Sequence, residues 1–436
     1  MANTLKLITK RNYRLIMPPV GSIVLLVTSL IGTAAAQASS PILIRDVRVF
    51  DGHRTIEHRS VLVTNGKIIK IIPADKPGPD EGKVIDGRGR TLLPGLIDSH
   101  VHVSDENSLW QALALGVTTV LDMFTSEERL NMMKRVERDD PLDMADVRTA
   151  GVGATAPHGH PTEMGGPPIP TISSPSEARA FVDARLEEGS DFIKIIYDDL
   201  SLRQKVPMLD RETLAALVNA AHRRHKLVIV HIGNESQARD VIAAHADGLA
   251  HIFFGKASSR DFGHFAARYH VFVIPTLVTL YSASGIGDGK ELLADPHLGA
   301  YIRSDLAKML AMSWPADESI CHGGNEAMRQ LIKERVSILA GTDAPIPGTT
   351  YGASLHGELE YYVKLGMTPV QALISATSTP AYFFHLDDRG VIRPGARADL
   401  LLVEGDPTRN ILATRNIVDV FKRGVVVQRQ RSADSR

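Results

Sequence analysis

The middle of the chain alternates between short apolar runs typical of strands and longer amphipathic segments typical of helices, and this alternation constrains the fold most strongly. Several intervals have helical periodicity, including Ser176–Glu188, Asp210–His225 and Glu235–Ala244. The strand-like runs are Gly95–His100, Thr118–Met123, Phe192–Ile196, Leu227–His231, Gly248–His251, Phe272–Pro275 and Ser337–Gly341. Strands that alternate with helices in this way build parallel sheets. We therefore predict an α/β fold whose main domain is a (β/α)8 TIM barrel.

Sequence rich in β-formers flanks this middle at both ends. Asn65-Gly66, between two β-branched runs, is a typical hairpin turn. The β-branched runs are Ile42–Val49, Ser60–Thr64, Lys67–Ile72, Ala398–Glu404 and Ile417–Val427. We predict a small β-sandwich domain built from both termini, with residues 39–94 and 389–436, around a barrel domain of residues 95–388.

Residues 1–38 have the character of a secretory signal peptide. Four basic residues between Lys6 and Arg14 precede an apolar run, 20–36, which ends in the small-x-small sequence Ala36-Gln37-Ala38. The run is short for a membrane span, which favours a cleaved signal over a retained anchor. We therefore expect a periplasmic or secreted protein with no stable membrane span after cleavage.

Charge and cysteine content exclude some classes of partner. The 49 basic and 50 acidic side chains nearly cancel, so nothing favours a nucleic-acid partner. A single cysteine, Cys321, cannot form an intrachain disulfide. We expect a small-molecule substrate, and the sequence leaves the oligomeric state open, a homo-oligomer included.

His100 and His102 close the first strand-like run of the predicted barrel. Residues i and i+2 of a strand point to the same side, so the two imidazoles can share one metal ion. An HxH pair alone arises often by chance, and two surface histidines are the plain alternative. The apolar strand that begins after Pro94-Gly95 favours the metal site.

Four further polar residues end or interrupt other apolar runs of the barrel: Lys194, His231, His251 and Asp343. Taken singly, each has an ordinary explanation: an extended surface lysine, hydrogen-bonded core histidines and a helix-capping aspartate. Burial would lower the pKa of Lys194, and a neutral amine can take up carbon dioxide to form an anionic carbamate. Together with the HxH pair, these side chains make a set that a divalent metal prefers, at the barrel end where such enzymes keep their sites.

The chain resembles the amidohydrolase superfamily over essentially the whole of its length after residue 38. The resemblance rests on Leu93-Pro-Gly-Leu-Ile-Asp-Ser-His-Val-His, the Lys194 strand, His231, His251, Gly341-Thr-Asp-Ala, Ala376-Thr-Ser-Thr-Pro-Ala and the tail Gly395-Ala-Arg-Ala-Asp-Leu-Leu-Leu. Within the superfamily, the chain is similar to the imidazolonepropionase-like branch, which includes Xaa-Pro and Xaa-Arg dipeptidases.

The resemblance implies two divalent metal ions, with zinc as the default for these ligands. It implies one metal on His100, His102 and Asp343, a second on His231 and His251, and a carboxylated Lys194 between them. If Lys194 is unmodified, the count falls to one metal. Asp343 would also carry a proton from the attacking water to the leaving amine.

The expected reaction is hydrolysis of an amide or peptide-like C–N bond in a dipeptide, an N-acyl amino acid or a cyclic amide. We expect Tyr197 and His160 to stabilise the oxyanion and contact substrate, and His356, in a predicted loop 351–356, to line the pocket. Arg203 is the available candidate for a substrate carboxylate. A lactone, carbamate or organophosphate ester hydrolase could use the same site. A non-catalytic binding protein is a third hypothesis, against which the complete ligand set argues.

Overall fold

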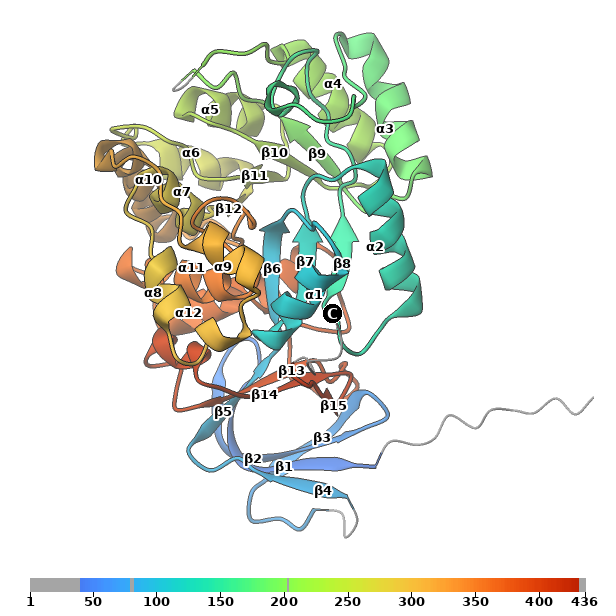
Figure 1. The fold of residues 1–436 in the computed structure, drawn as a ribbon, viewed down its shortest axis with the longest axis vertical. Helices are drawn as coiled ribbons and strands as arrows, with labels where there is room; N and C mark the ends of the chain where they lie inside the picture. Colours follow the sequence, from blue (N-terminus) through green and yellow to red (C-terminus); the bar gives the residue numbers. More distant parts are fainter. Residues whose placement is uncertain (1–39, 79–81, 202–203, 431–436) are drawn as a thin grey trace, which may run out of the picture. The chain divides into compact units, whose positions relative to one another are not determined.

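The computed structural model describes residues 40–78, 82–201 and 204–430 (Figure 1). The predicted signal peptide, residues 1–38, and Arg203 lie outside these described residues. Within the described ranges, no helix combines the length and the apolar character needed to cross a membrane.

Strands from the two ends of the described chain form one eight-stranded sheet with the order β15-β14-β13-β5-β1-β2-β3, and β4 pairs with β1. Antiparallel pairing of β5 with β13, with Pro94 opposite Leu400, joins the N-terminal strands to the C-terminal ones. Asn65 and Gly66 have φ values of 49° and 76° and form the predicted hairpin turn between β2 and β3. The strands are β1 (Ile42–Phe50), β2 (Thr55–Thr64), β3 (Lys67–Pro73), β4 (Lys83–Asp86), β5 (Arg90–Pro94), β13 (Leu400–Glu404), β14 (Ile417–Lys422) and β15 (Val425–Val426).

Two parallel sheets occupy the middle of the chain, with the orders β6-β7-β8 and β12-β11-β10-β9. An isolated parallel bridge between Ala154 and Ile195 connects the two sheets. Two further bridges, Val273 with Ile338 and Val101 with Ala344, connect β12 and β6 to the stretch 337–344, where the sequence predicts a strand. The strands are β6 (Leu96–Val101), β7 (Val117–Asp122), β8 (Asp146–Thr149), β9 (Ile193–Ile196), β10 (Val228–His231), β11 (Gly248–Ala250) and β12 (Phe272–Ile274).

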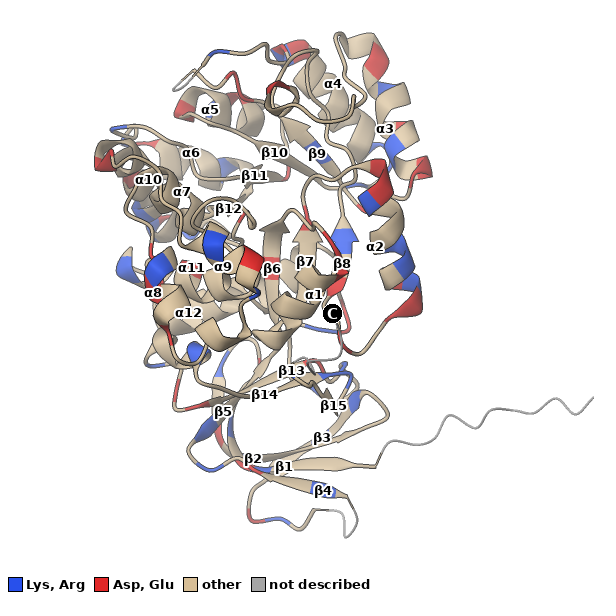
Figure 2. Ribbon diagram, in the orientation of Figure 1, with Lys and Arg blue, Asp and Glu red and all other residues tan. Residues whose placement is uncertain are grey.

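Helices follow most of these strands in the chain. The helix α2 packs against the next strand, β8, and α4 packs against the next strand, β10. In Figure 2 the strands are mostly tan, while blue and red segments alternate along α2 and α3. The helices are α1 (Glu106–Ala114), α2 (Glu127–Asp139), α3 (Ala178–Glu187), α4 (Arg211–His222), α5 (Glu235–Ala243), α6 (Phe262–Tyr269), α7 (Leu277–Ala283), α8 (Gly289–Ala294), α9 (Ser304–Leu310), α10 (His322–Lys333), α11 (Ala353–Lys364), α12 (Pro369–Ser375) and α13 (Ser378–Phe383).

Polar side chains contact the start of α12 and the start of the short helical turn before α3 in different ways. Thr368 and Gln371 form a capping box at the start of α12, in which each side chain satisfies a backbone N–H of the other residue. The Ser174 hydroxyl instead contacts the side chains of Ser176 and Glu177.

The strands of the middle region bury both faces, in two separate apolar cores. Ile193 and Ile195 of β9 belong to a core shared with the helices. Phe192 belongs to a second core with Ile229 and Phe272 on the opposite side of the strands. Because side chains alternate along a strand, each residue of β9 is assigned to one of these two sides by its position.

Candidate metal centre

His100, His102 and Asp343 meet beside β6. His100 is fully buried, and its Nε2 lies 3.2 Å from Asp343 Oδ1, while His102 Nε2 lies 2.9 Å from the same oxygen. The Asp343 backbone N–H donates to the His100 carbonyl over 2.7 Å, which fixes the two residues relative to each other. One carboxylate oxygen thus faces two imidazole nitrogens, an arrangement suited to a shared cation.

His231 and His251 complete the group from β10 and from the residue after β11. Their ring centroids lie 4.6 Å apart, and the His251 ring lies 4.7 Å from that of His100. Ligand atoms of His100, His251 and Asp343 all lie within 4.8 Å of one another. Neither His251 nor Asp343 has strand geometry, because their φ values are 76° and 60°. These left-handed conformations are unusual for residues other than glycine, and such conformations are concentrated at functional sites.

Lys194 projects from β9 on the side of Phe192, away from the helices. Its side chain is 1% exposed, and its Nζ has no hydrogen-bond partner among the described residues. Burial lowers the pKa of Lys194 to about 7, although the carboxylates of Asp343 and Asp122 oppose this shift.

The donor set fits a metal ion. Both ring nitrogens of buried His100 also lack a partner with hydrogen-bond geometry within the described part of the chain. Burial, followed by the charge of Lys194, lowers the pKa of His100 to about 3, so the ring is neutral and its lone pair is available. Unpaired buried polar atoms are costly, and a cation held by these nitrogens would satisfy them.

Three histidines of the group have a second partner that orients the ring. His102 Nδ1 donates to the Phe124 carbonyl over 3.1 Å, and His251 Nδ1 lies 2.8 Å from Thr276 Oγ1. His231 uses Nε2 toward Asp198 Oδ2 at 3.3 Å, which leaves its Nδ1 for the centre. Such partners fix the tautomer and direction of a metal-binding histidine.

These orienting residues and two buried carboxylates, Asp98 and Asp122, were not predicted from the sequence. Asp98 accepts hydrogen bonds from the His100 backbone N–H and the Thr342 hydroxyl, and burial raises its pKa to about 7. Asp122 accepts from Thr149 Oγ1, and burial raises its pKa to about 6. An acidic residue inside an apolar strand was the available signal for both, since an unpaired charge there would be costly.

His160 lies beside the predicted ligands. Its ring centroid is 5.2 Å from that of His231, and its Nδ1 pairs with Glu163 Oε1 at 2.7 Å. The Thr155 hydroxyl also donates to the His160 carbonyl over 2.6 Å, which ties the loop to the residue after Ala154, where the chain bridges to β9. His160 thus lies next to His231, and its predicted contact with substrate stays a prediction.

The Tyr197 side chain lies in the helical layer, apart from the predicted ligands. Tyr197 follows β9 at the position that faces the helices, in the same core as Ile193 and Ile195. Its hydroxyl donates to Asp240 Oδ2 on α5 over 3.2 Å. The period of two along the strand places Lys194 and Tyr197 on opposite sides, so this position does not support the predicted contact of Tyr197 with an oxyanion at the centre.

His356 does not lie in the predicted loop. His356 lies within α11 rather than in a loop and is 1% exposed. Its Nε2 donates to the Leu115 carbonyl over 3.0 Å, and its Nδ1 lies 3.0 Å from Thr414 Oγ1. Both ring nitrogens are therefore engaged in joining α11 to its neighbours, and neither is free for a substrate.

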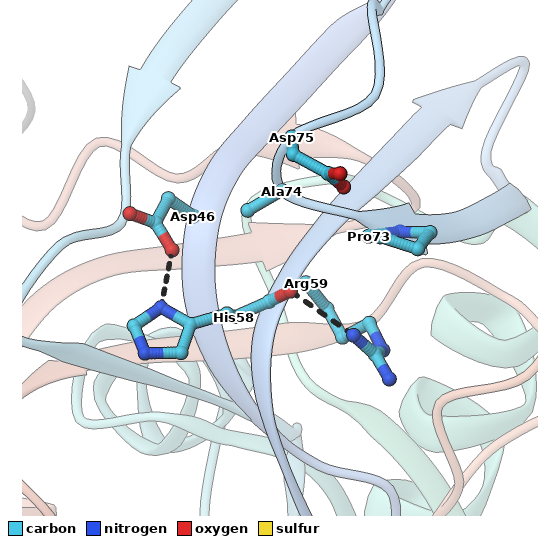
Figure 3. Close-up of a pocket in the computed structure, with 6 residues that line it drawn as sticks. All are labelled: Asp46, His58, Arg59, Pro73, Ala74 and Asp75. Atoms are coloured by element: carbon cyan, nitrogen blue, oxygen red, sulfur yellow. Dashed lines mark hydrogen bonds and ion pairs between the residues drawn. The ribbon is translucent and has the colours of Figure 1, made fainter.

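A surface hollow on the terminal sheet involves none of these residues. Figure 3 shows its lining, in which His58 Nδ1 pairs with Asp46 Oδ1 at 2.8 Å. The His58 side chain is 80% exposed, unlike the buried histidines of the metal centre. The hollow therefore lacks the dry surroundings that strengthen electrostatic interactions with a reacting group.

Comparison with known proteins identifies the group to which this arrangement belongs. The model of the family described as "Amidohydrolase family" matches residues 91–427, which confirms the resemblance drawn from the sequence motifs. An adenine deaminase of Desulforamulus reducens is 21% identical over 85% of this chain, and the alignment spans 55% of the deaminase, which is therefore much longer. An imidazolonepropionase of Cutibacterium acnes is 46% identical over a stretch covering 17% of this chain and 18% of that enzyme.

The fold is shared with solved structures. The crystal structure of a Xaa-Pro dipeptidase with bound methionine in its active site has a TM-score of 0.71 and 22% sequence identity. The match covers 89% of this chain and all of that one.

Proposed function

Because this chain belongs to the amidohydrolase family, we propose that it is a metal-dependent hydrolase that cleaves an amide or peptide-like C–N bond in a small molecule. One observation carries the proposal: ligand atoms of His100, His251 and Asp343 converge within 4.8 Å, and the buried amine of Lys194 has no hydrogen-bond partner in the described part of the chain. This is a ligand set for a divalent cation with open positions for water and substrate.

Two metal ions, with zinc the best match to nitrogen and oxygen ligands, fit these donors. One would be held by His100, His102 and Asp343, and the second by His231 and His251. Lys194, carboxylated on Nζ, would contribute to both; if it is unmodified, we expect one metal. When bound, such ions lower the pKa of water and polarise a carbonyl group.

Asp343 is the proposed proton carrier. The carboxylate is buried, but the neighbouring His251 and His100 hold its pKa well below the usual range, so it is ionised at neutral pH. Its Oδ1 faces His100 and His102, which leaves Oδ2 to take the proton of the attacking water and deliver it to the departing amine.

His160 is the proposed contact to the substrate oxygen. Glu163 Oε1 accepts the proton on Nδ1, so Nε2 can donate to a developing oxyanion or to a substrate carboxylate when the ring is the doubly protonated imidazolium. Its place beside His231 supports this role. Dipeptides, N-acyl amino acids and cyclic amides are the substrates that we propose to assay.

Metal analysis and assays of the wild type and Asp343→Asn test the proposal. Asparagine keeps an oxygen donor but cannot carry a proton, so we expect retained metal and a loss of about 10²- to 10⁴-fold in kcat. Asp139→Asn, at an exposed carboxylate, is the matched control and should leave both unchanged.

The panel should include lactones with the amides. Full activity of Asp343→Asn with metal bound would overturn the proton-carrier role. Hydrolysis of lactones alone would overturn the choice of the C–N bond. A wild-type protein that binds no metal and hydrolyses nothing would favour the binding-protein hypothesis.

We further propose that β6–β12 and the stretch 337–344 form a closed (β/α)8 barrel, and that the terminal sheet folds into a sandwich. The bridges at Ala154, Ile338 and Ala344 support closure, because they link the two parallel sheets and their outer strands. The shared core of Val47, Val63 and other residues of the terminal strands supports a sandwich. The basic and apolar pattern of residues 1–38 supports export to the periplasm.

A further inference from the structure

Thr276 has a backbone conformation that its side chain disfavours. It links β12 to α7 with φ 49° and ψ 52°, in the left-handed region, and is 1% exposed. A β-branched residue there is a genuine outlier, because Cβ and its branches crowd the backbone. Glycine or asparagine would adopt this conformation more readily, so a buried threonine needs a reason specific to its side chain.

The side chain provides that reason. Thr276 Oγ1 lies 2.8 Å from Nδ1 of His251, a member of the metal centre. An imidazole that uses Nδ1–H as a donor has its lone pair on Nε2. The contact occupies Nδ1 and leaves Nε2 for a metal ion. When Nε2 binds the ion, the ring proton lies on Nδ1, and the Thr276 hydroxyl, which can donate or accept, accepts it.

Glu358 holds the strained turn in place. Glu358 lies on α11, and its side-chain oxygens accept hydrogen bonds from the backbone N–H groups of Leu277 and Val278, each over 2.8 Å. These two residues directly follow Thr276 and open α7. The backbone on the other side is fixed as well, because His251 N–H donates to Ile274 O and Ile252 N–H donates to Pro275 O.

We propose that Thr276 is a positioning residue for the metal centre: its hydroxyl accepts the Nδ1 proton of His251, and Glu358 fixes the turn that presents this hydroxyl. The inference rests on the proposed metal-dependent function and adds a residue that acts through a ligand rather than on the substrate. Glu358 joins α11 to the centre without touching a ligand.

The test compares three substitutions at this position by zinc affinity, measured on the metal-free full chain by competition with a chelator. Thr276→Val keeps the branched shape and removes the hydroxyl, so the dissociation constant should rise by about 10- to 100-fold. Thr276→Ser keeps the hydroxyl and should stay within about threefold of the wild type. Thr377→Val is the control. Thr377 is equally buried, but its hydroxyl donates to the backbone carbonyl of Leu373 and not to a histidine of the metal centre.

Thr276→Gly separates positioning from stability. Glycine adopts the left-handed conformation without strain, so the metal-free variant should unfold at a urea concentration equal to or higher than that of the wild type. Its zinc affinity should nevertheless fall as in Thr276→Val. A purely structural role would make affinity and stability change together.

The outcomes are distinguishable from those of the proposed function. A wild-type chain that binds no zinc would overturn the metal centre itself. Wild-type binding with equal affinity in Thr276→Val, or an equal loss in Thr276→Ser, would overturn the positioning role alone. If Thr276→Val does not fold, Thr276→Gly and Thr276→Ser still decide between the two readings.

Discussion

Lys194 shows how a single side chain can decide the number of metal ions. A charged lysine is poorly tolerated in a buried site without a partner, and burial lowers its pKa to about 7. At neutral pH a substantial fraction of the amine is therefore uncharged and can attack carbon dioxide. The carbamate would turn a buried cation into an anionic ligand beside four histidines.

We expect carboxylation of Lys194 to be observable directly. Protein prepared with ¹³C-bicarbonate and metal should give a carbamate resonance, which Lys194→Met should lose together with one bound metal ion per chain. Lys364→Met, at an exposed lysine, should retain the resonance and the metal. Two metal ions in Lys194→Met would contradict the bridging role.

The sequence could indicate the ligands but not what orients them. His231 and Lys194 stand out because each is a polar residue in an apolar strand. Thr276 and Asp198 give no such signal, because their partners come from elements distant in the sequence. The left-handed backbone of Asp343 is likewise imposed by tertiary contacts.

At the scale of elements, the alternation along β9 decides which polar residues reach the centre. Lys194 and Tyr197 are three positions apart, so they face opposite sides of the strand. The sequence placed both near one strand end but did not assign their sides. In α11, the helix begins at Ala353, three residues before His356, and turns this histidine into the protein interior.

Tyr197→Phe should therefore leave catalysis intact. The hydroxyl contacts Asp240, which Arg211 also binds, so its loss removes one hydrogen bond in the helical layer. We expect kcat/KM within about twofold of the wild type and a loss of about 0.5–1.5 kcal/mol in the free energy of unfolding. Steady-state kinetics and urea titration measure the two. A tenfold fall in kcat with metal retained would restore Tyr197 as a candidate for the oxyanion site.

For the molecule as a whole, a buried ionic network connects the terminal sheet to the parallel sheets. Asp146, at the start of β8, pairs with Lys422 of β14 and with Arg389 and Arg397. Arg397 also pairs with Asp399, and the side chains of Lys422 and Asp399 are almost completely buried. The sequence predicted that both ends of the chain would be β-rich, but it could not reveal that one carboxylate pairs with three cations from the C-terminal segment.

Asp146→Asn should destabilise the whole chain, because it leaves three cations without their shared carboxylate. Removal of one partner from a buried ionic group costs about 3–5 kcal/mol, and urea unfolding at pH 7 should show a loss of this order. Asp139→Asn, at an exposed carboxylate, should change the free energy of unfolding by at most about 0.5 kcal/mol.

The pH dependence of the free energy of unfolding, measured for the wild type and Asp146→Asn, provides an independent check. Lys422 and the neighbouring arginines hold the pKa of Asp146 below its usual value of 3.8, although burial acts in the opposite direction. The unfolded chain therefore binds this proton more readily than the folded one, so the stabilisation is present above about pH 4 and is lost as the pH falls through the folded pKa. Asparagine has no proton to take up, so the stability difference between wild type and Asp146→Asn should shrink as the pH is lowered from 5 to 3. A difference that stays constant over this range would show that the Asp146 carboxylate does not stabilise the junction through its charge.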